Sequence, residues 1–260
     1  MKSELVRFED WTDPVRAVER EVVSLTDGAR GDRPPLLFVP GLGHGAWAFA
    51  EHWLPRAAER GFAAHALTPR AGGDLRAQVH DVVQVAASLP RQAVLVGHGT
   101  GALVVAYAMG RYPARAGVLA APVLDGWPTL WAALRANPFG TLPALFGGRL
   151  RMSREQLFGP AMPAEQARPI LDRVAAKPGR ELVTHGPVPR PAGDPPVLVA
   201  GSPDDRVVPR ASLDRTATRY GGAPLLFPGM GHDLMLDVTW SEPIEAVLDW
   251  LDKELPSAGQ

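Results

Sequence analysis

The sequence predicts an α/β fold with a mainly parallel sheet flanked by helices, and three observations predict it. Short apolar runs rich in Val, Leu and Ala recur along the chain, as expected of strands that are buried on both faces. Segments with apolar residues at helical spacing separate these runs. Glycine and proline stand at many of the junctions. Alternating strands and helices imply right-handed crossovers and therefore parallel strands.

The first half of the chain shows this alternation most clearly. Apolar runs predict strands at residues 5–8, 21–25, 34–41, 62–67, 94–97 and 116–121, the first two as edge strands. Apolar residues at helical spacing predict helices at residues 47–61, 74–89 and 102–109. Gly61 and Pro90 are stop signals for the first two helices. The third helix is apolar all round and is therefore expected to be buried.

The alternation is interrupted between residues 126 and 191. This segment is too long for an ordinary connection, and it contains a helical pattern at residues 164–176. We interpret it as a cap inserted over the carboxyl edge of the sheet, so that residues 1–125 and 192–260 form the core domain. Taken singly, each aromatic side chain of the segment is expected to pack on the core rather than to contact substrate. As a group, these side chains indicate an apolar pocket.

The last part of the chain returns to the first pattern. Strands are predicted at residues 195–201 and 224–228, and helices at residues 212–220 and 241–255. The glycine pair at 221–222 ends the first of these helices.

Composition excludes several classes of protein. With 46% hydrophobic and 21% charged residues, the chain can build a substantial core and is not disordered. Its net charge of −1, without a block of like charges, argues against nucleic acid or an anionic membrane surface as an obligatory partner. No apolar run has the length of a membrane span, and charges near Met1 argue against a signal peptide, so a cytoplasmic protein is expected. The lack of cysteine excludes disulfides and thiolate metal sites, and the sequence carries no signal of oligomeric state.

The stretch from Val94 to Gly101 carries the clearest functional motif. An apolar run, a turn of small residues and a buried helix form the context of the Gly-x-Ser-x-Gly nucleophile elbow. Gly97 and Gly101 occupy the outer positions, where side chains would collide as strand and helix pass each other. Gly99 occupies the middle position, where the motif has its nucleophilic serine. The motif therefore predicts the fold, but the position of the nucleophile lacks a serine.

A second glycine-rich loop follows the strand at 34–41, and it has two interpretations. Gly41, Gly43 and Ala46 fit the Gly-x-Gly-x-x-Ala fingerprint of dinucleotide-binding proteins. That fingerprint requires an acidic residue after the next strand, where this chain has Thr68-Pro69-Arg70 instead. The favoured interpretation is a loop whose backbone N–H stabilises a developing oxyanion. No cofactor is therefore expected.

Four segments together resemble the α/β-hydrolase superfamily of serine esterases, lipases and thioesterases, over roughly residues 34–255. They are residues 39–47, 97–101, 201–209 and 231–237, in the chain order elbow, acid, histidine. The resemblance implies that His232 is the general base. For the acid that orients it, the Asp-Arg-Val-Val-Pro pattern favours Asp205, whereas counting from Gly201 favours Asp204. It also implies an oxyanion hole formed by the backbone N–H groups of Leu42 and Thr100.

Further residues are predicted to line the substrate pocket. They are Gly41, His44 and His98 beside the two glycine turns, and Trp127 and Trp131 from the cap. No cluster of His, Asp and Glu has metal-ligand spacing, so no metal is expected. The expected partner is a small apolar acyl or polycyclic substrate.

Glycine cannot attack a carbonyl, so position 99 leaves three functional interpretations open. The first is a hydrolase of apolar carboxylic esters or thioesters whose nucleophile has been replaced, and the otherwise complete set of roles favours it. The second is a non-covalent catalyst that uses His232 as the base in an elimination, cyclisation or isomerisation. The third is a ligand-binding protein without catalysis, for which an acid–histidine pair is unnecessary.

Overall fold

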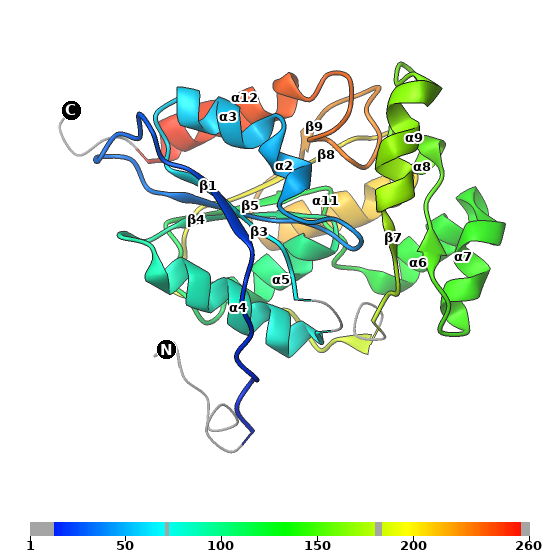
Figure 1. Ribbon diagram of the computed structural model, residues 1–260, viewed down its shortest axis with the longest axis horizontal. Coiled ribbons are helices and arrows are strands. Elements are labelled where there is room, and N and C mark those ends of the chain that lie inside the picture. Colours follow the sequence, from blue (N-terminus) through cyan, green and yellow to red (C-terminus); the bar gives the residue numbers. More distant parts are fainter. Residues whose placement is uncertain (1–12, 71–72, 180–183, 256–260) are drawn as a thin grey trace.

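The computed structural model describes residues 13–70, 73–179 and 184–255. Its core is a seven-stranded sheet with the order β1-β3-β2-β4-β5-β8-β9 (Figure 1). The strands are Val22–Leu25, Ala64–Leu67, Leu36–Val39, Val94–His98, Ala116–Ala120, Val197–Gly201 and Leu225–Leu226, in that spatial order. Only β1 among them pairs antiparallel, at one edge, and the remaining pairs are parallel. The mainly parallel α/β architecture is thus confirmed, whereas the predicted strand at 5–8 lies outside the described residues.

Helices cover both faces of the sheet, and the strand side chains alternate between them. Leu36 and Phe38 of β2 join the core under α3 (Trp53–Glu59) and α12 (Ser241–Glu254). Leu37 and Val39 join the opposite core, which is formed with α4, α5 and α11. The bounds of these last three helices are Leu75–Ser88, Thr100–Met109 and Arg210–Arg219. Burial on both faces explains why the strands are apolar without alternation.

The predicted helix at 47–61 is two helices in the structure, so that prediction is corrected. They are α2 (Trp47–Ala50) and α3, and the break lies at His52, whose φ of −128° and ψ of −59° are not helical. Pro55 explains the break, because proline has no N–H and its ring clashes with the carbonyl four residues before it. The helix predicted at 164–176 is also shorter, since α9 ends at Arg173.

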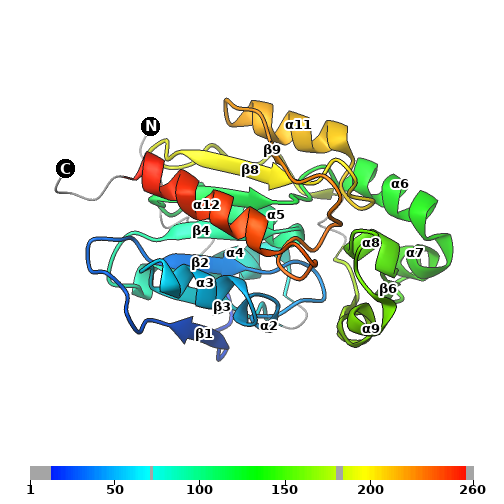
Figure 2. The ribbon, with the colours of Figure 1, turned by 90° about the horizontal axis from the view of Figure 1, so that it is seen from above.

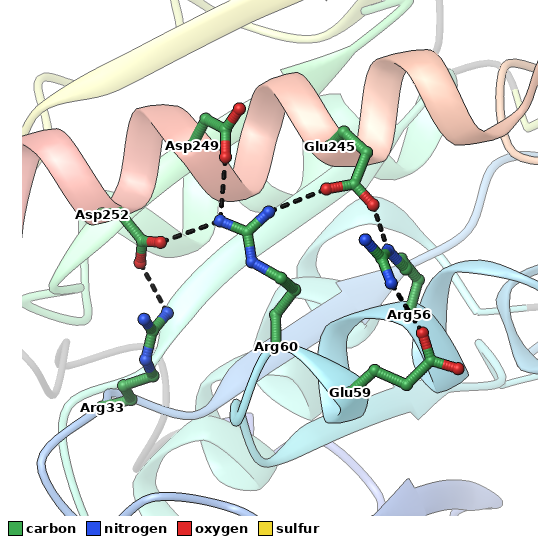
Figure 3. A network of polar contacts seen from close by, with 7 residues as sticks. All are labelled: Arg33, Arg56, Glu59, Arg60, Glu245, Asp249 and Asp252. Atoms are coloured by element: carbon green, nitrogen blue, oxygen red, sulfur yellow. Dashed lines mark hydrogen bonds and ion pairs between the residues drawn. The ribbon is translucent and has the colours of Figure 1, made fainter.

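A network of ion pairs ties α3 to α12 on the outer surface (Figure 3). The Arg60 guanidinium lies 2.7 Å from Glu245 and 2.8 Å from Asp249. Asp252 is shared, at 2.9 Å from Arg60 and 2.5 Å from Arg33, which precedes β2. Because α12 is the last described helix and α3 one of the first, the network joins segments that are far apart in sequence.

Residues 126–191 lie between β5 and β8 and hold several short elements. These are α6 (Gly126–Ala136), α7 (Pro138–Leu145), β6 (Leu150–Arg151), α8 (Arg154–Leu157), α9 (Ala164–Arg173) and β7 (Ala175–Ala176). Both views show them beyond one end of the sheet, with α7 at the edge of the molecule (Figures 1 and 2). Leu157, Phe158 and Met162 are buried in the same core as α12, whereas α6 and α7 contribute only Ala133 and Thr141 to the buried residues. The segment is therefore anchored through α8 and more exposed at α6 and α7.

Candidate active site

The candidate site lies at the carboxyl edge of the parallel strands. The loops that follow β2, β4, β8 and β9 bring Gly41, Gly99, Asp205 and His232 to this edge. In open α/β sheets this is the edge at which ligands bind, because the strand ends and helix starts meet there. Four segments that are distant in sequence are therefore placed around one point.

Gly99 stands at the turn between β4 and α5 with the backbone of a nucleophile elbow. Its φ of 54° and ψ of −120° are in a region that glycine adopts without strain. The turn is fixed on both sides, because Gly99 N–H donates to the Ala120 carbonyl and Val123 N–H donates to the Gly99 carbonyl, each at 3.0 Å. A Cβ at Gly97 or Gly101 would lie 2.6 Å or less from backbone atoms, so the outer glycines are required by packing.

His232 and Asp205 form a buried pair beside this turn. The Nδ1 atom of His232 lies 2.8 Å from Asp205 Oδ2, and both side chains are almost fully buried. The other carboxylate oxygen of Asp205 accepts the backbone N–H groups of Val207 and Val208, which fixes its orientation. A Cβ on Gly99 would lie 3.1 Å from His232 Nε2, so the second ring nitrogen faces the elbow position.

Burial and charge act in opposite directions on His232. Burial lowers the pKa of the imidazole, but the charge and hydrogen bond of Asp205, with a smaller contribution from Asp233, raise it above its ordinary value. With its raised pKa, the imidazole of His232 binds a proton more strongly than an ordinary histidine does.

Asp204, the alternative acid, has a different role in the structure. Its Oδ2 accepts the backbone N–H of Gly229 at 2.7 Å, and its own N–H donates to the Ser202 hydroxyl. It therefore links the loops after β8 and β9, while Asp205 contacts the imidazole.

The loop after β2 packs against the elbow. A Cβ on Gly41 would lie 3.1 Å from the His98 carbonyl oxygen and 3.5 Å from the Thr100 nitrogen, so the loop passes close to the elbow backbone. Leu42 and Thr100 both line the cavity described below, so the two residues predicted as oxyanion donors lie on its wall. The loop thus brings two backbone segments to the same side of position 99.

A second buried carboxylate, Asp233, lies beside the site and was missed by the sequence reasoning. Its Oδ2 is 2.9 Å from His44 Nε2, and both side chains are buried. His44 Nδ1 faces the Leu42 carbonyl oxygen at 3.2 Å, so each ring nitrogen lies within hydrogen-bond distance of an acceptor. Burial would raise the pKa of Asp233, but the charge and hydrogen bond of His44 hold it below its ordinary value. The His44–Asp233 pair therefore stabilises the loop that contains Leu42.

His98 completes a cluster of three imidazoles. Its Nε2 donates to the His232 carbonyl oxygen at 3.0 Å, and the two rings are 4.8 Å apart. Burial, reinforced by the charge of His232, lowers the pKa of His98 to about 3, so this ring is neutral. The neutral ring helps to position His232 through its backbone.

Three potential metal ligands do come together in the described part of the chain, namely His98, His232 and Asp233. Their hydrogen bonds argue against coordination, because His98 Nε2 and His232 Nδ1 are already engaged with a carbonyl and with Asp205. A metal would have to displace those contacts. The residues present fit an acid–base site better than a metal centre.

A cavity of about 250 Å³ opens above the elbow. Gly41, His44, His98 and His232 line its floor together with Leu42, Thr100 and Val207, and the rest of the wall is mostly apolar and comes from residues 123–179. The part of the wall that comes from α6 and α7 includes Thr129, Leu130, Ala133, Thr141, Ala144 and Leu145. Such a shape, apolar with a few convergent polar groups, is typical of a small-molecule site.

Trp127 and Trp131 differ from the expectation that they contact substrate. They are 59% and 68% exposed and do not line the cavity. On α6 the cavity side is formed by Thr129, Leu130 and Ala133, and the helical repeat turns the two tryptophans away from it. The ring of His185 does not line the cavity either, and it is hydrogen-bonded to the Leu124 and Gly186 carbonyls.

Asp237 links the loop of His232 to the inserted segment, and the sequence motifs gave this residue no role of its own. Its Oδ2 accepts the N–H groups of Gly159 and Gly231 at 2.7 and 2.8 Å. Backbone bonds add to this, since Asp233 N–H donates to the Leu157 carbonyl at 2.8 Å. The position of the imidazole therefore depends on the inserted segment.

Comparisons with known proteins agree with the fold. Residues 36–250 match the sequence model of the alpha/beta hydrolase family. A monoacylglycerol lipase from Paleococcus ferrophilus is 17% identical, with a TM-score of 0.68 that covers 91% of this chain and 100% of that one. A soluble variant of monoglyceride lipase from Saccharomyces cerevisiae is 12% identical, with a TM-score of 0.71 over 90% of this chain and 92% of that one.

A bromoperoxidase from Bacillus anthracis is also similar, at 17% identity and a TM-score of 0.65 over 90% of this chain and 95% of that one. No curated protein sequence matches the chain significantly. At these identities the structural likeness concerns the fold alone. The family match covers most of the chain, and with the strand order and the four loops described above it shows that this protein belongs to the alpha/beta hydrolase family.

Proposed function

We propose that this protein binds an apolar carboxylic ester or thioester and carries the acid–base and oxyanion groups of a serine hydrolase, with Gly99 in place of the nucleophile. The observation that supports it most is the pair Asp205–His232, whose second ring nitrogen faces position 99 of an elbow. The backbone N–H groups of Leu42 and Thr100 form the oxyanion hole, and residues 126–191 act as the cap over the substrate.

In this proposal the chemical roles are divided as follows. Asp205 holds the imidazole with Nε2 toward the substrate. With serine at position 99, His232 would take the proton of the serine hydroxyl as its oxygen attacks the carbonyl and would give that proton to the leaving group. The apolar cavity binds the acyl chain and excludes water from the reacting carbonyl. Without a hydroxyl at position 99 covalent acyl transfer is lost, which lowers turnover by about a millionfold in comparable enzymes.

The test is the substitution Gly99→Ser, with Gly99→Ala as its matched control. Both variants add a Cβ at φ 54°, but only serine adds a nucleophile. We expect Gly99→Ser to hydrolyse p-nitrophenyl or thioester acyl chains at least about a thousandfold faster than Gly99→Ala. It should also be labelled by a fluorophosphonate, and His232→Ala in the same background should abolish both. A folded Gly99→Ser protein that stays inert and unlabelled would refute the proposal.

A second candidate function is base catalysis without a covalent intermediate. The 3.1 Å between His232 Nε2 and a Cβ at position 99 is tight, so a side chain there requires the ring to shift by a few tenths of an ångström. The arrangement fits glycine as it stands, which favours proton transfer directly from a bound substrate. We expect the unmodified protein then to incorporate deuterium from D₂O into bound carbonyl compounds. Loss of that exchange in His232→Ala would support this candidate.

A further inference from the structure

The outer side of α6 and α7 carries a concentration of exposed apolar side chains. We call it the aromatic face, and its members with their exposed fractions are Trp127 (59%), Trp131 (68%), Phe139 (90%), Leu142 (43%), Leu145 (47%) and Phe146 (87%). Among the described residues, only Leu25 and Val238 are other large apolar side chains that are this exposed. A concentration of exposed large apolar side chains of this kind marks an interaction site.

Helical geometry puts these side chains on the same outward side. Trp127 and Trp131 are one turn apart on α6, opposite to the residues of α6 that line the cavity. Phe139 and Leu142 are three positions apart on α7, and Phe146 follows directly after its end, while Thr141 and Ala144 face the cavity. In both views α7 forms the edge of the molecule (Figures 1 and 2). Nothing in the described part of the chain covers this side.

The charged residues within the segment that carries the aromatic face are all positive. Residues 126–151 contain Arg135, Arg149 and Arg151, all exposed, and no acidic residue, although the whole chain has a net charge of −1. Because the chain has no long block of like charges, this local excess of arginine over acidic residues is not evident from the charge pattern of the sequence. Tryptophan and phenylalanine with flanking arginine are the side chains that favour the boundary between lipid head groups and acyl chains.

We propose that the aromatic face docks this protein on an anionic lipid surface. The arginines attract anionic head groups, and the exposed rings enter the boundary region of the lipid. A second copy of the chain fits less well, because a two-fold pairing of this face would bring the same arginines of both copies together. Docking by surface insertion needs no spanning segment, and no described helix is long and apolar enough to cross a bilayer.

The aromatic face is continuous with the cavity. Leu145 is 47% exposed and lines the cavity as well, so one side chain belongs to both surfaces. The helices that would rest on the lipid are the same helices that form the cavity wall. An apolar ligand dissolved in the lipid therefore has a short path to the site, whatever reaction takes place there.

The test measures binding to vesicles, independently of catalysis. The unmodified protein should float with vesicles of phosphatidylcholine containing phosphatidylglycerol, and its tryptophan emission should shift to the blue. Binding to pure phosphatidylcholine should be at least about tenfold weaker, and added salt should weaken binding to the anionic vesicles. Equal binding to both vesicle types, or none to either, would overturn the proposal.

Two pairs of variants identify the surface. Arg135→Glu with Arg149→Glu should weaken binding to anionic vesicles at least about tenfold, whereas Arg91→Glu with Arg115→Glu should not. The control pair is also exposed and changes the net charge equally, but it precedes β4 and β5 at the opposite end of the sheet. Phe139→Ser with Phe146→Ser should also reduce binding, with an unchanged melting temperature because both rings are exposed. If these serine substitutions instead abolish a dimer seen by sedimentation, and vesicle binding is absent, the occupant is a second copy and the proposal fails.

Discussion

The imidazole of His232 lies between two carboxylates that differ in their contacts. Asp205 bonds directly to Nδ1, whereas Asp233 is engaged with His44 and influences His232 only through its charge. Because both raise the pKa against the effect of burial, His232 is protonated up to a higher pH than an ordinary histidine. A proton acceptor must be neutral, so under the proposed function the low-pH limb of the activity of Gly99→Ser would report this raised value.

At the scale of single residues this predicts the effect of Asp205→Asn in the Gly99→Ser background. The amide removes the negative charge, so the midpoint of the low-pH limb of kcat/KM should move to lower pH. The rate at the plateau should fall about 10³–10⁴-fold, because the amide favours the wrong tautomer. The matched control is Asp204→Asn, which should leave the midpoint unchanged because Asp204 bonds to Gly229 instead. A midpoint that moves with Asp204→Asn and not with Asp205→Asn would reverse the assignment of the acid.

At the scale of elements, α4 is held in place by a buried carboxylate. Asp81 is 1% exposed and accepts hydrogen bonds from Arg70 at 2.5 and 2.6 Å and from Arg20 at 2.7 Å. Burial would raise the pKa of Asp81, but the two arginines hold it below its ordinary value. We expect Asp81→Asn to lower the free energy of unfolding by about 2–4 kcal/mol at neutral pH, because two partly buried guanidinium groups lose their partner.

The stability contributed by Asp81 and its two arginines depends on pH with a definite sign. Since the pKa of Asp81 is lower in the folded chain, its contribution is complete above the unfolded value near 3.8 and is lost as the pH falls through the folded value. Urea denaturation should therefore show the difference between the parent and Asp81→Asn shrinking below about pH 4. Asp27→Asn, at an exposed turn, should change stability by less than about 0.5 kcal/mol. A difference that grows on acidification would contradict the assignment.

At the scale of the whole molecule, the insertion and the histidine loop form one unit. Asp237 joins Gly159 to Gly231, and a Cβ on either glycine would lie 2.4 Å or less from backbone of the opposite segment. We expect Asp237→Ala to cost about 3 kcal/mol of stability, because it leaves buried N–H groups without an acceptor. Hydrogen exchange should then accelerate together at residues 156–159 and 231–234. Acceleration in only one of the two segments would show that they open independently.

The sequence predicted the sheet and the chain order of the site because these depend on local patterns. A strand buried on both faces must be apolar throughout, and the elbow needs glycine at 97 and 101 for local steric reasons. His232 was recognisable because it follows the last strand next to a glycine. The break at His52 was also present in the sequence, since Pro55 marks it.

Other features depend on contacts between distant residues and could not be predicted. His44 and Asp233 are separated by 189 positions, and neither side chain alone indicates the pair. The exposure of Trp127 and Trp131 depends on which side of α6 finds a neighbour, and an aromatic residue looks the same in either case. The net charge could not indicate the three arginines of residues 126–151 either, because a total over the chain discards the location of each charge.

The three glycines of the elbow differ in how readily they accept a side chain. At 97 and 101 a Cβ would meet backbone at 2.6 Å and 2.3 Å, whereas at 99 it would meet only the end of the His232 ring at 3.1 Å. Position 99 is thus the one of the three where a Cβ meets no backbone closely, and a side chain there has to accept only a φ of 54° and a small shift of the ring. Under the proposed function, one exchange between glycine and serine would switch covalent chemistry off or on while the sheet, the pocket and the acid–base pair stay unchanged.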